Sequence, residues 1–188
     1  MAVDNSSHFT VAVCGSAGGT FSNTIAKKAY EIGKYLATQG CILFSGATLG
    51  YSCDATRGAH DTGGLTIGIS PAENLHEQLE RYEHIDPKLW NTIVYTGIGY
   101  KARDVVMMRS IDAAILIGGG VGTLLELTLA IDFQKVIGIL DGSGGAIDLR
   151  EQVAAISHRH KPSYIVSKNP KPLVENVISE LKRRAYAK

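Results

Sequence analysis

The residues best suited to chemistry lie at positions 118–126, which read GGGVGTLLE. Glycines let backbone N–H groups approach an anion, and the N-terminus of a helix adds a partial positive charge. The Thr123 hydroxyl can also donate to a phosphate oxygen. We therefore predict a phosphate site formed by Gly119, Gly120, Val121, Gly122 and Thr123. A structural alternative is that Thr123 and Glu126, which have the spacing of a capping box, close the helix.

These glycines do not match the common nucleotide-binding fingerprints. Neither GSAGGT at residues 15–20 nor GGGVGT at residues 118–123 spells GxGxxG. The segment FSG at residues 44–46 offers no acidic residue for a ribose diol, and no GxxxxGK[ST] loop occurs in the sequence. A phosphorylated ligand of mononucleotide size therefore fits better than a dinucleotide or a hydrolysed triphosphate.

Two arginines in the segment ARDVVMMRSIDA, residues 102–113, are further candidates for holding an anion. Arg103 and Arg109 are six residues apart, which is about 240° around a helix, so they cannot share one face. At most one of them need point into a site. Either arginine could instead be solvated or form an ion pair with Asp104 or Asp112.

The elements that must position these residues alternate between short apolar runs and helical patterns. We expect seven strands, at residues 9–15, 41–46, 65–70, 91–97, 113–120, 136–140 and 163–167. We expect helices at residues 22–39, 52–62, 100–110, 123–133 and 147–157, and a last helix carrying Val174, Val177, Ile178 and Leu181 on one stripe. Residues 72–91 are the least periodic part and are expected to form an irregular lid or a short helix. The fold class predicted is α/β, a Rossmann-like doubly wound parallel sheet with helices on both faces.

The glycine clusters at 15–19, 46–50 and 118–122 all follow predicted strands. The carboxyl ends of parallel strands meet at one edge of the sheet, where ligands bind at the point of strand-order reversal. We therefore expect Gly15, Ser16 and Gly46 to lie beside the phosphate site. Residues 1–8 are expected to be a flexible tail, and residues 9–188 a single nucleotide-binding domain.

Composition excludes several classes of protein. The 188 residues are 45% hydrophobic and 20% charged, which is enough apolar material for a core. A net charge of +1 gives no indication of binding to nucleic acid or to an anionic membrane. No apolar run in the sequence is long enough to span a bilayer. No signal peptide is visible, so a cytoplasmic location is expected.

Cysteine and histidine offer no metal site or disulfide framework. The three cysteines, Cys14, Cys41 and Cys53, are odd in number and have no CxxC spacing. The histidines are scattered, so we expect no metal and no cofactor. Cys14 would end the first strand beside the pocket, where a small buried hydrophobe is the favoured interpretation, and Tyr51 could stack on a base.

Taken together, these motifs resemble those of a known family. The order Arg103, Met107, Arg109, Asp112-Ala113 and then GGxGTxxE ending at Glu126 is similar to the Lonely Guy (LOG) family, which also carries the older label "possible lysine decarboxylase". The resemblance implies a Rossmann-like fold, a homodimer and cleavage of the N-glycosidic bond of a cytokinin riboside 5′-monophosphate. It also implies that Arg103 and Glu126 are the catalytic pair and that residues 119–123 are the phosphate loop.

The sequence departs from that family at several positions. The family's proline before GGxGT is Gly118 here, its lysine after the catalytic arginine is Asp104, and the first glutamate of its GTxEE is Leu125. The segments SGATLGYSCDA and GISPAEN look closer to the molybdenum-cofactor carrier branch of the same superfamily. Decarboxylation with pyridoxal phosphate needs a Schiff-base lysine, and neither motif holds one; Lys101 only borders the arginine segment.

Two functions follow from these observations. The first is a phosphoribohydrolase, in which Glu126 activates water or stabilises an oxocarbenium-like sugar and Arg103 holds the phosphate, the ribose or the departing base. The second is a non-catalytic carrier or binding protein for a phosphorylated pterin, such as the molybdenum cofactor, or for a nucleotide. Retention of Arg103 and Glu126 favours the enzyme, whereas Asp104 and the SGATLG loop favour the carrier.

Overall fold

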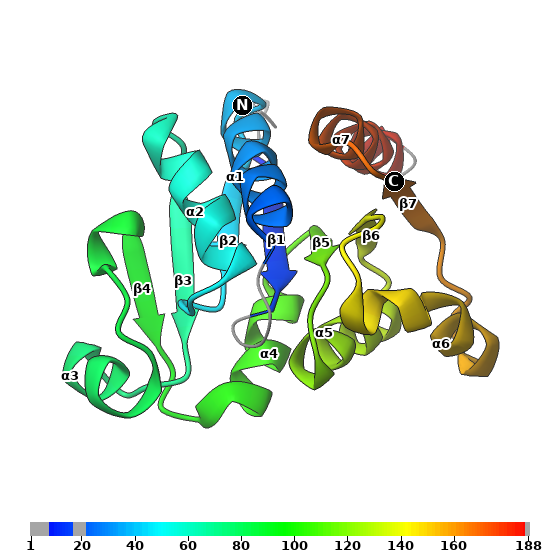
Figure 1. The fold of residues 1–188 in the computed structure, drawn as a ribbon. Helices are drawn as coiled ribbons and strands as arrows, with labels where there is room; N and C mark the ends of the chain where they lie inside the picture. The colour runs from blue at the N-terminus through cyan, green and yellow to red at the C-terminus, as the bar shows by residue number, and fades with distance from the viewer. Residues whose placement is uncertain (1–7, 17–21, 187–188) are drawn as a thin grey trace, which may run out of the picture.

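The structure, a computed structural model, describes residues 8–16 and 22–186. Seven parallel strands form one sheet in the order β4-β3-β2-β1-β5-β6-β7 (Figure 1). The strands are β1 (Thr10–Gly15), β2 (Ile42–Ser45), β3 (Thr66–Ser70), β4 (Thr92–Tyr95), β5 (Ala113–Ile117), β6 (Val136–Leu140) and β7 (Tyr164–Ser167). The predicted Rossmann-like α/β fold is confirmed, with each strand at its expected place. Of the expected tail at residues 1–8, residues 1–7 lie outside the described residues, as do the glycines at 18 and 19, and His8 contacts the Gly40 carbonyl through Nδ1 at 2.7 Å.

Helices cover both faces of the sheet (Figure 1). The longer ones are α1 (Asn23–Thr38), α2 (Tyr51–Asp61), α4 (Gly99–Arg109), α5 (Val121–Asp132), α6 (Arg150–Ile156) and α7 (Pro170–Tyr186), with the short turn η3 (Gly145–Leu149) before α6. One core cluster joins the sheet to α1, α2 and α7, and a second joins its other face to α4 and α5. Within residues 8–16 and 22–186, no helix combines the length and hydrophobicity needed to cross a lipid bilayer.

The strand order reverses between β1 and β5, at the centre of the sheet. β1 pairs with β2 on one side and with β5 on the other, where Cys14 lies opposite Leu116. Connections run from β1 outward to β4, and from β5 outward to β7 in the other direction. Such a reversal opens a crevice at the carboxyl ends of the two central strands. Gly15 and Gly118 flank this crevice.

The loop between β2 and α2 has an unusual backbone. Ala47 adopts a φ of 51°, a left-handed conformation uncommon for a residue with a side chain, and Gly50 adopts a φ of 84°. The buried Gln78 donates from Nε2 to the Ala47 carbonyl at 3.3 Å and accepts from Ser70 Oγ at 2.6 Å. Gln78 therefore ties this loop to β3.

Residues 72–91, expected to be irregular or shortly helical, form three short turns. These are α3 (Leu75–Glu77), the π-helical turn η1 (Gln78–Tyr82) and the 3₁₀ turn η2 (Pro87–Leu89). A carboxylate oxygen of Glu83, just after η1, accepts a hydrogen bond from the Leu49 N–H. The segment thus supports the β2–α2 loop that borders the crevice.

Candidate functional site

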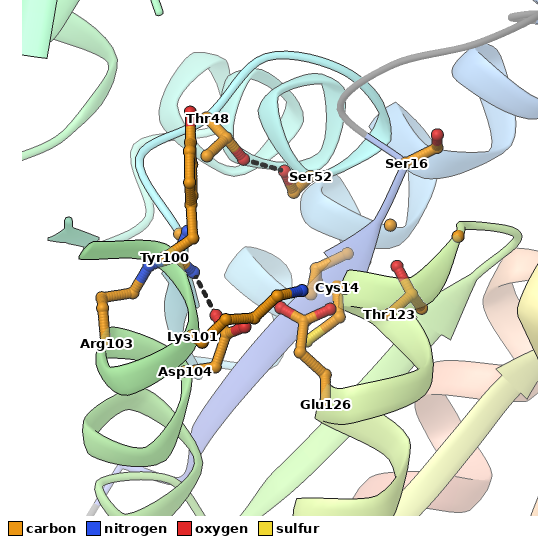
Figure 2. A pocket seen from close by; sticks show the side chains of 15 residues that line it. Cys14, Ser16, Thr48, Ser52, Tyr100, Lys101, Arg103, Asp104, Thr123 and Glu126 are labelled. Atoms are coloured by element: carbon orange, nitrogen blue, oxygen red, sulfur yellow. Dashed lines mark hydrogen bonds and ion pairs between the residues drawn. The ribbon is translucent and has the colours of Figure 1, made fainter. Parts of the chain in front are cut away.

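A pocket of about 340 Å³ lies at the carboxyl ends of β1, β2 and β5 (Figure 2). Ligand sites in proteins commonly enclose about 300–1,000 Å³, so the volume suits a small molecule. The structure brings most of the residues predicted from the sequence to this pocket, namely Gly15, Ser16, Gly46, Arg103, Gly120, Gly122, Thr123 and Glu126. Its lining also includes Val13, Cys14, Thr48, Ser52, Tyr100, Lys101 and Asp104.

Helix α5 begins at Val121, two residues before the predicted start. Gly120 is the N-cap residue, and no side chain caps the helix. Thr123 and Glu126 are therefore the third and sixth helical residues, whereas a capping box needs the N-cap and third positions. The capping-box alternative is wrong, so both side chains are left for other contacts.

The four glycines around the start of α5 differ in why glycine is present at their positions. Gly118 and Gly119 have φ values of 56° and 94°, in the left-handed region that favours glycine. A Cβ atom at Gly119 would lie 2.1 Å from Thr123 Oγ1, so Gly119 forms the turn above Thr123 rather than the pocket wall. A Cβ atom at Gly120 or Gly122 would meet no heavy atom within 4 Å. Packing alone does not require glycine there, whereas an approaching ligand would.

The N-terminal turn of α5 provides donors for an anion. The first four N–H groups of a helix have no acceptor within the helix, and here they belong to residues 120–123. They lie at a helix end with partial positive charge, which favours a phosphate or carboxylate. The Val121 side chain is 76% exposed and does not line the pocket, so only its backbone can serve such a site.

Arg103 is buried and held in place by α4 and by the β2–α2 loop. Its Nη1 forms an ion pair with Asp104 Oδ1 at 2.7 Å, and both side chains are almost fully buried. A Cβ atom at position 46 would lie 2.3 Å from Nη1, so the guanidinium packs on the Gly46 backbone. Within the described part of the chain, Arg103 Nε is buried without a hydrogen-bond partner. The Asp104 pairing considered from the sequence is the arrangement that Arg103 adopts.

Arg109, predicted to bind ligand, does not reach this pocket. It ends α4, and its Cζ lies 4.2 Å from the centre of the Phe133 ring. Six residues of helix separate it from Arg103 by about 9 Å along the axis and place it on another face. The assignment of Arg109 to the ligand site is therefore corrected by helix geometry.

Glu126, Cys14 and Asp104 form a buried acidic cluster at the floor of the pocket. Burial, followed by the Asp104 carboxylate, raises the pKa of Glu126 to about 8, although Arg103, a hydrogen bond with Cys14 and Lys101 each lower it. Burial, followed by Glu126 and Asp104, also raises the pKa of the Cys14 thiol. Near neutral pH Glu126 is therefore mainly protonated and Cys14 is a thiol, which agrees with the interpretation of Cys14 as no nucleophile.

Two pocket residues, Lys101 and Tyr100, are missed by sequence reasoning and line the pocket from the first turn of α4 (Figure 2). Lys101 precedes Asp104 by three residues, a spacing that places both on one helix face and could have indicated its position. The Tyr100 ring packs edge-on against Tyr82 at 5.1 Å and remains 40% exposed. Tyr51, by contrast, is buried in the core and accepts a hydrogen bond from the Ser22 N–H, so it is not the base-stacking residue.

The polar groups of the pocket are not arranged as metal ligands. In the part of the chain that the structure describes, no group of three or more His, Cys, Asp or Glu residues is placed to hold a metal ion. The pocket offers instead backbone N–H groups, hydroxyls, two cations and two carboxyls. This set suits a polar organic anion such as a phosphate ester.

Comparison with known proteins identifies the family. The sequence model of the SLOG cluster4 family matches residues 8–174, and the chain belongs to that family. An uncharacterized protein of Archaeoglobus fulgidus is 30% identical over 112 residues, which cover 60% of this chain and 68% of that protein.

Two solved structures share the fold over almost the whole chain. The molybdenum cofactor binding protein of the phototrophic bacterium Rippkaea orientalis is 28% identical, with a TM-score of 0.75, and the match covers 94% of this chain and 99% of that one. The molybdenum cofactor carrier protein of Chlamydomonas reinhardtii is 25% identical, with the same TM-score and coverage. The likeness to the molybdenum-cofactor carrier branch is thus confirmed alongside the LOG-type fold.

Proposed function

We propose that this protein binds a small phosphorylated pterin, of the molybdenum cofactor type, and carries it without cleaving it. The names of the Rippkaea orientalis and Chlamydomonas reinhardtii proteins support this class of ligand. In this proposal the phosphate contacts the N-terminal turn of α5, at residues 120–123, and the heterocycle lies toward Tyr100. Tyr100 is 40% exposed, and a partly exposed aromatic ring can stack on a planar heterocycle.

The observation that carries the proposal is the ion pair between Arg103 and Asp104. Hydrolysis of an N-glycosidic bond needs an ionised carboxylate to activate water or to face the oxocarbenium-like sugar. It is also helped by a cation at the departing group. Here Asp104 compensates the charge of Arg103 at 2.7 Å, and Glu126 is mainly protonated near neutral pH. The LOG resemblance implies that both residues are catalytic, but Glu126 lacks the ionised carboxylate that this reaction needs, and the charge of Arg103 is paired with Asp104 rather than left for a departing group.

A second candidate is the phosphoribohydrolase itself. The observation in its favour is that Arg103 and Glu126, which come from different helices, line one pocket beside the N-terminal turn of α5. If the enzyme is the correct function, its rate should rise with pH as Glu126 ionises through about 8, because only the carboxylate can act as a base. The carrier predicts no cleavage at any pH in this range.

One experiment separates the two candidates. The purified protein is dialysed against neopterin monophosphate, neopterin and adenosine monophosphate, and each mixture is then analysed by chromatography. A carrier binds neopterin monophosphate with one ligand per chain, more tightly than neopterin, and releases no adenine from the nucleotide. Release of free adenine that increases from about pH 6 to about pH 9 would instead establish the hydrolase.

The assembly and location expected from the sequence belong to the same proposal. We propose that residues 9–188 act as one ligand-binding domain, that the protein is cytoplasmic, and that two copies form a homodimer. Val105 and Val106 are 39% and 38% exposed on α4, and Leu125 and Leu129 on the neighbouring α5 are only partly buried. A second copy would remove these apolar side chains from water.

A further inference from the structure

Lys101 lies in the first turn of α4 and reaches into the pocket. Its side chain runs across the pocket, and its ammonium group points toward the Glu126 carboxyl group (Figure 2). It is close enough to both Glu126 and Asp104 for its charge to lower the pKa of each. Lys101 is thus part of the pocket's electrostatics although it is exposed to solvent overall.

The charged side chains that line the pocket are not all paired with one another. Arg103 and Asp104 form an ion pair, and Glu126 is buried against Cys14. Among residues 8–16 and 22–186, no carboxylate lies within ion-pair distance of the Lys101 ammonium group. Lys101 is therefore the pocket cation whose charge is left for a ligand.

Arg103 cannot easily take that role. Its guanidinium is packed on the Gly46 backbone, and turning Nη1 toward a ligand would break the contact with Asp104. Losing the partner of a buried charge is costly, because the remaining charge is left desolvated. The lysine ammonium is a compact charge on a flexible stem, so it can move to an anion without giving up a structural contact.

We infer that Lys101 is the binding residue that holds the anionic group of the ligand against the N-terminal turn of α5. The inference rests on the proposed function, because it names the cation for the phosphate of that ligand. It also explains how the pocket accepts an anion beside the Asp104 carboxylate, which by itself would repel one. The resemblance to the LOG family implies a lysine directly after the arginine; here the lysine comes one helical turn before Asp104, on the same face of α4.

The test compares Lys101→Gln with Lys101→Arg and with a matched control, Lys34→Gln. Lys34 is exposed on α1, which packs on the other face of the sheet, so the control changes net charge by the same amount outside the pocket. The probes are inorganic phosphate, neopterin monophosphate and neopterin, titrated by calorimetry at low and high salt. None of them contains an N-glycosidic bond, so hydrolysis cannot interfere with the binding measurement.

Lys101→Gln is expected to weaken the binding of phosphate and neopterin monophosphate about tenfold or more, the usual scale for one charge-assisted hydrogen bond. It should leave neopterin binding unchanged and reduce the dependence of affinity on salt, whereas Lys101→Arg and Lys34→Gln should bind like the parent. Equal binding of phosphate by Lys101→Gln and the parent would overturn the inference while leaving the proposed function intact. Equal weakening of both pterins would also overturn it, and a parent protein that binds no phosphorylated probe would overturn both.

Discussion

The protonated state of Glu126 predicts an unusual dependence of stability on pH. Its carboxyl pKa is raised from 4.5 to about 8 in the folded protein, chiefly by burial. Between these values the folded protein keeps a proton that the unfolded chain has released. The contribution of the protonated Glu126 carboxyl to the free energy of unfolding is therefore complete below the carboxyl pKa of the unfolded chain, and it is lost as pH rises through about 8. Glu126→Gln removes the titrating group while keeping the shape and most of the hydrogen-bonding capacity.

The size of the effect follows from the same values. Within this window the free energy of unfolding of the parent protein falls by about 1.4 kcal/mol for each pH unit. The full interval from 4.5 to about 8 therefore corresponds to about 5 kcal/mol. Between about pH 5.5 and about pH 7.5 the expected loss of stability is about 2–3 kcal/mol. The substituted glutamine side chain cannot ionise, so the stability of Glu126→Gln relative to the parent should rise by these amounts.

The assay is urea unfolding of the parent and of Glu126→Gln at several pH values from about 5 to about 9. Titrating groups that do not interact with Glu126 are common to both proteins and cancel in the difference between the two free energies of unfolding, and the interacting groups are Asp104 and Cys14. Glu31→Gln, an exposed change on α1, serves as the control and should follow the parent at every pH. Parallel curves for Glu126→Gln and the parent would show that Glu126 is ionised in the folded protein, and the charge argument against hydrolysis would fail with it.

Two further predictions concern the N-terminal turn of α5 and the proposed homodimer. Gly122→Ala should stabilise the protein by about 0.5–1 kcal/mol in urea unfolding, because alanine favours the helix and a Cβ atom at this position meets no neighbour. The same substitution should weaken phosphate binding in calorimetry, because the added methyl group narrows the approach of the anion to the backbone N–H groups. Unchanged phosphate affinity would place the anion elsewhere. The parent should sediment as a dimer at micromolar concentration and Val106→Glu as a monomer, since the charge would have to be buried in the apolar contact; a monomeric parent would contradict the homodimer.

The fold can be predicted from the sequence because its local patterns agree with one another. The central strand β5 is fully buried and reads as an uninterrupted apolar run, and α1 shows its buried stripe at helical spacing. The predicted start of α5 is two residues late because valine and glycine at positions 121 and 122 are weak helix formers, while TxxE imitates a capping box. The left-handed backbone at Gly118 and Gly119 sets the start of α5, and no sequence pattern predicts this geometry.

The site can be predicted only where a motif fixes a position along the chain. Arg103 and Glu126 are identifiable because they stand at set distances from the glycine loop, and the sheet then brings them together. The partner of each side chain depends on the direction in which that side chain points, and the spacing of residues along the sequence does not determine this direction. Thus Arg109, in the same segment, faces Phe133, whereas Lys101, outside both motifs, enters the pocket.

The charge at position 104 decides how the whole pocket behaves. A lysine after Arg103, as the LOG resemblance implies, would add a second positive charge beside Glu126 and favour its ionised form. Asp104 does the opposite, because it compensates Arg103 and its own charge helps to raise the pKa of Glu126. The pocket thereby loses a carboxylate that could attack or stabilise a sugar, but it keeps the helix N-terminus and the Lys101 ammonium for an anion. Under the proposed carrier function, this exchange of charge on one face of α4 disfavours cleavage of an N-glycosidic bond while leaving the groups that can bind an anion.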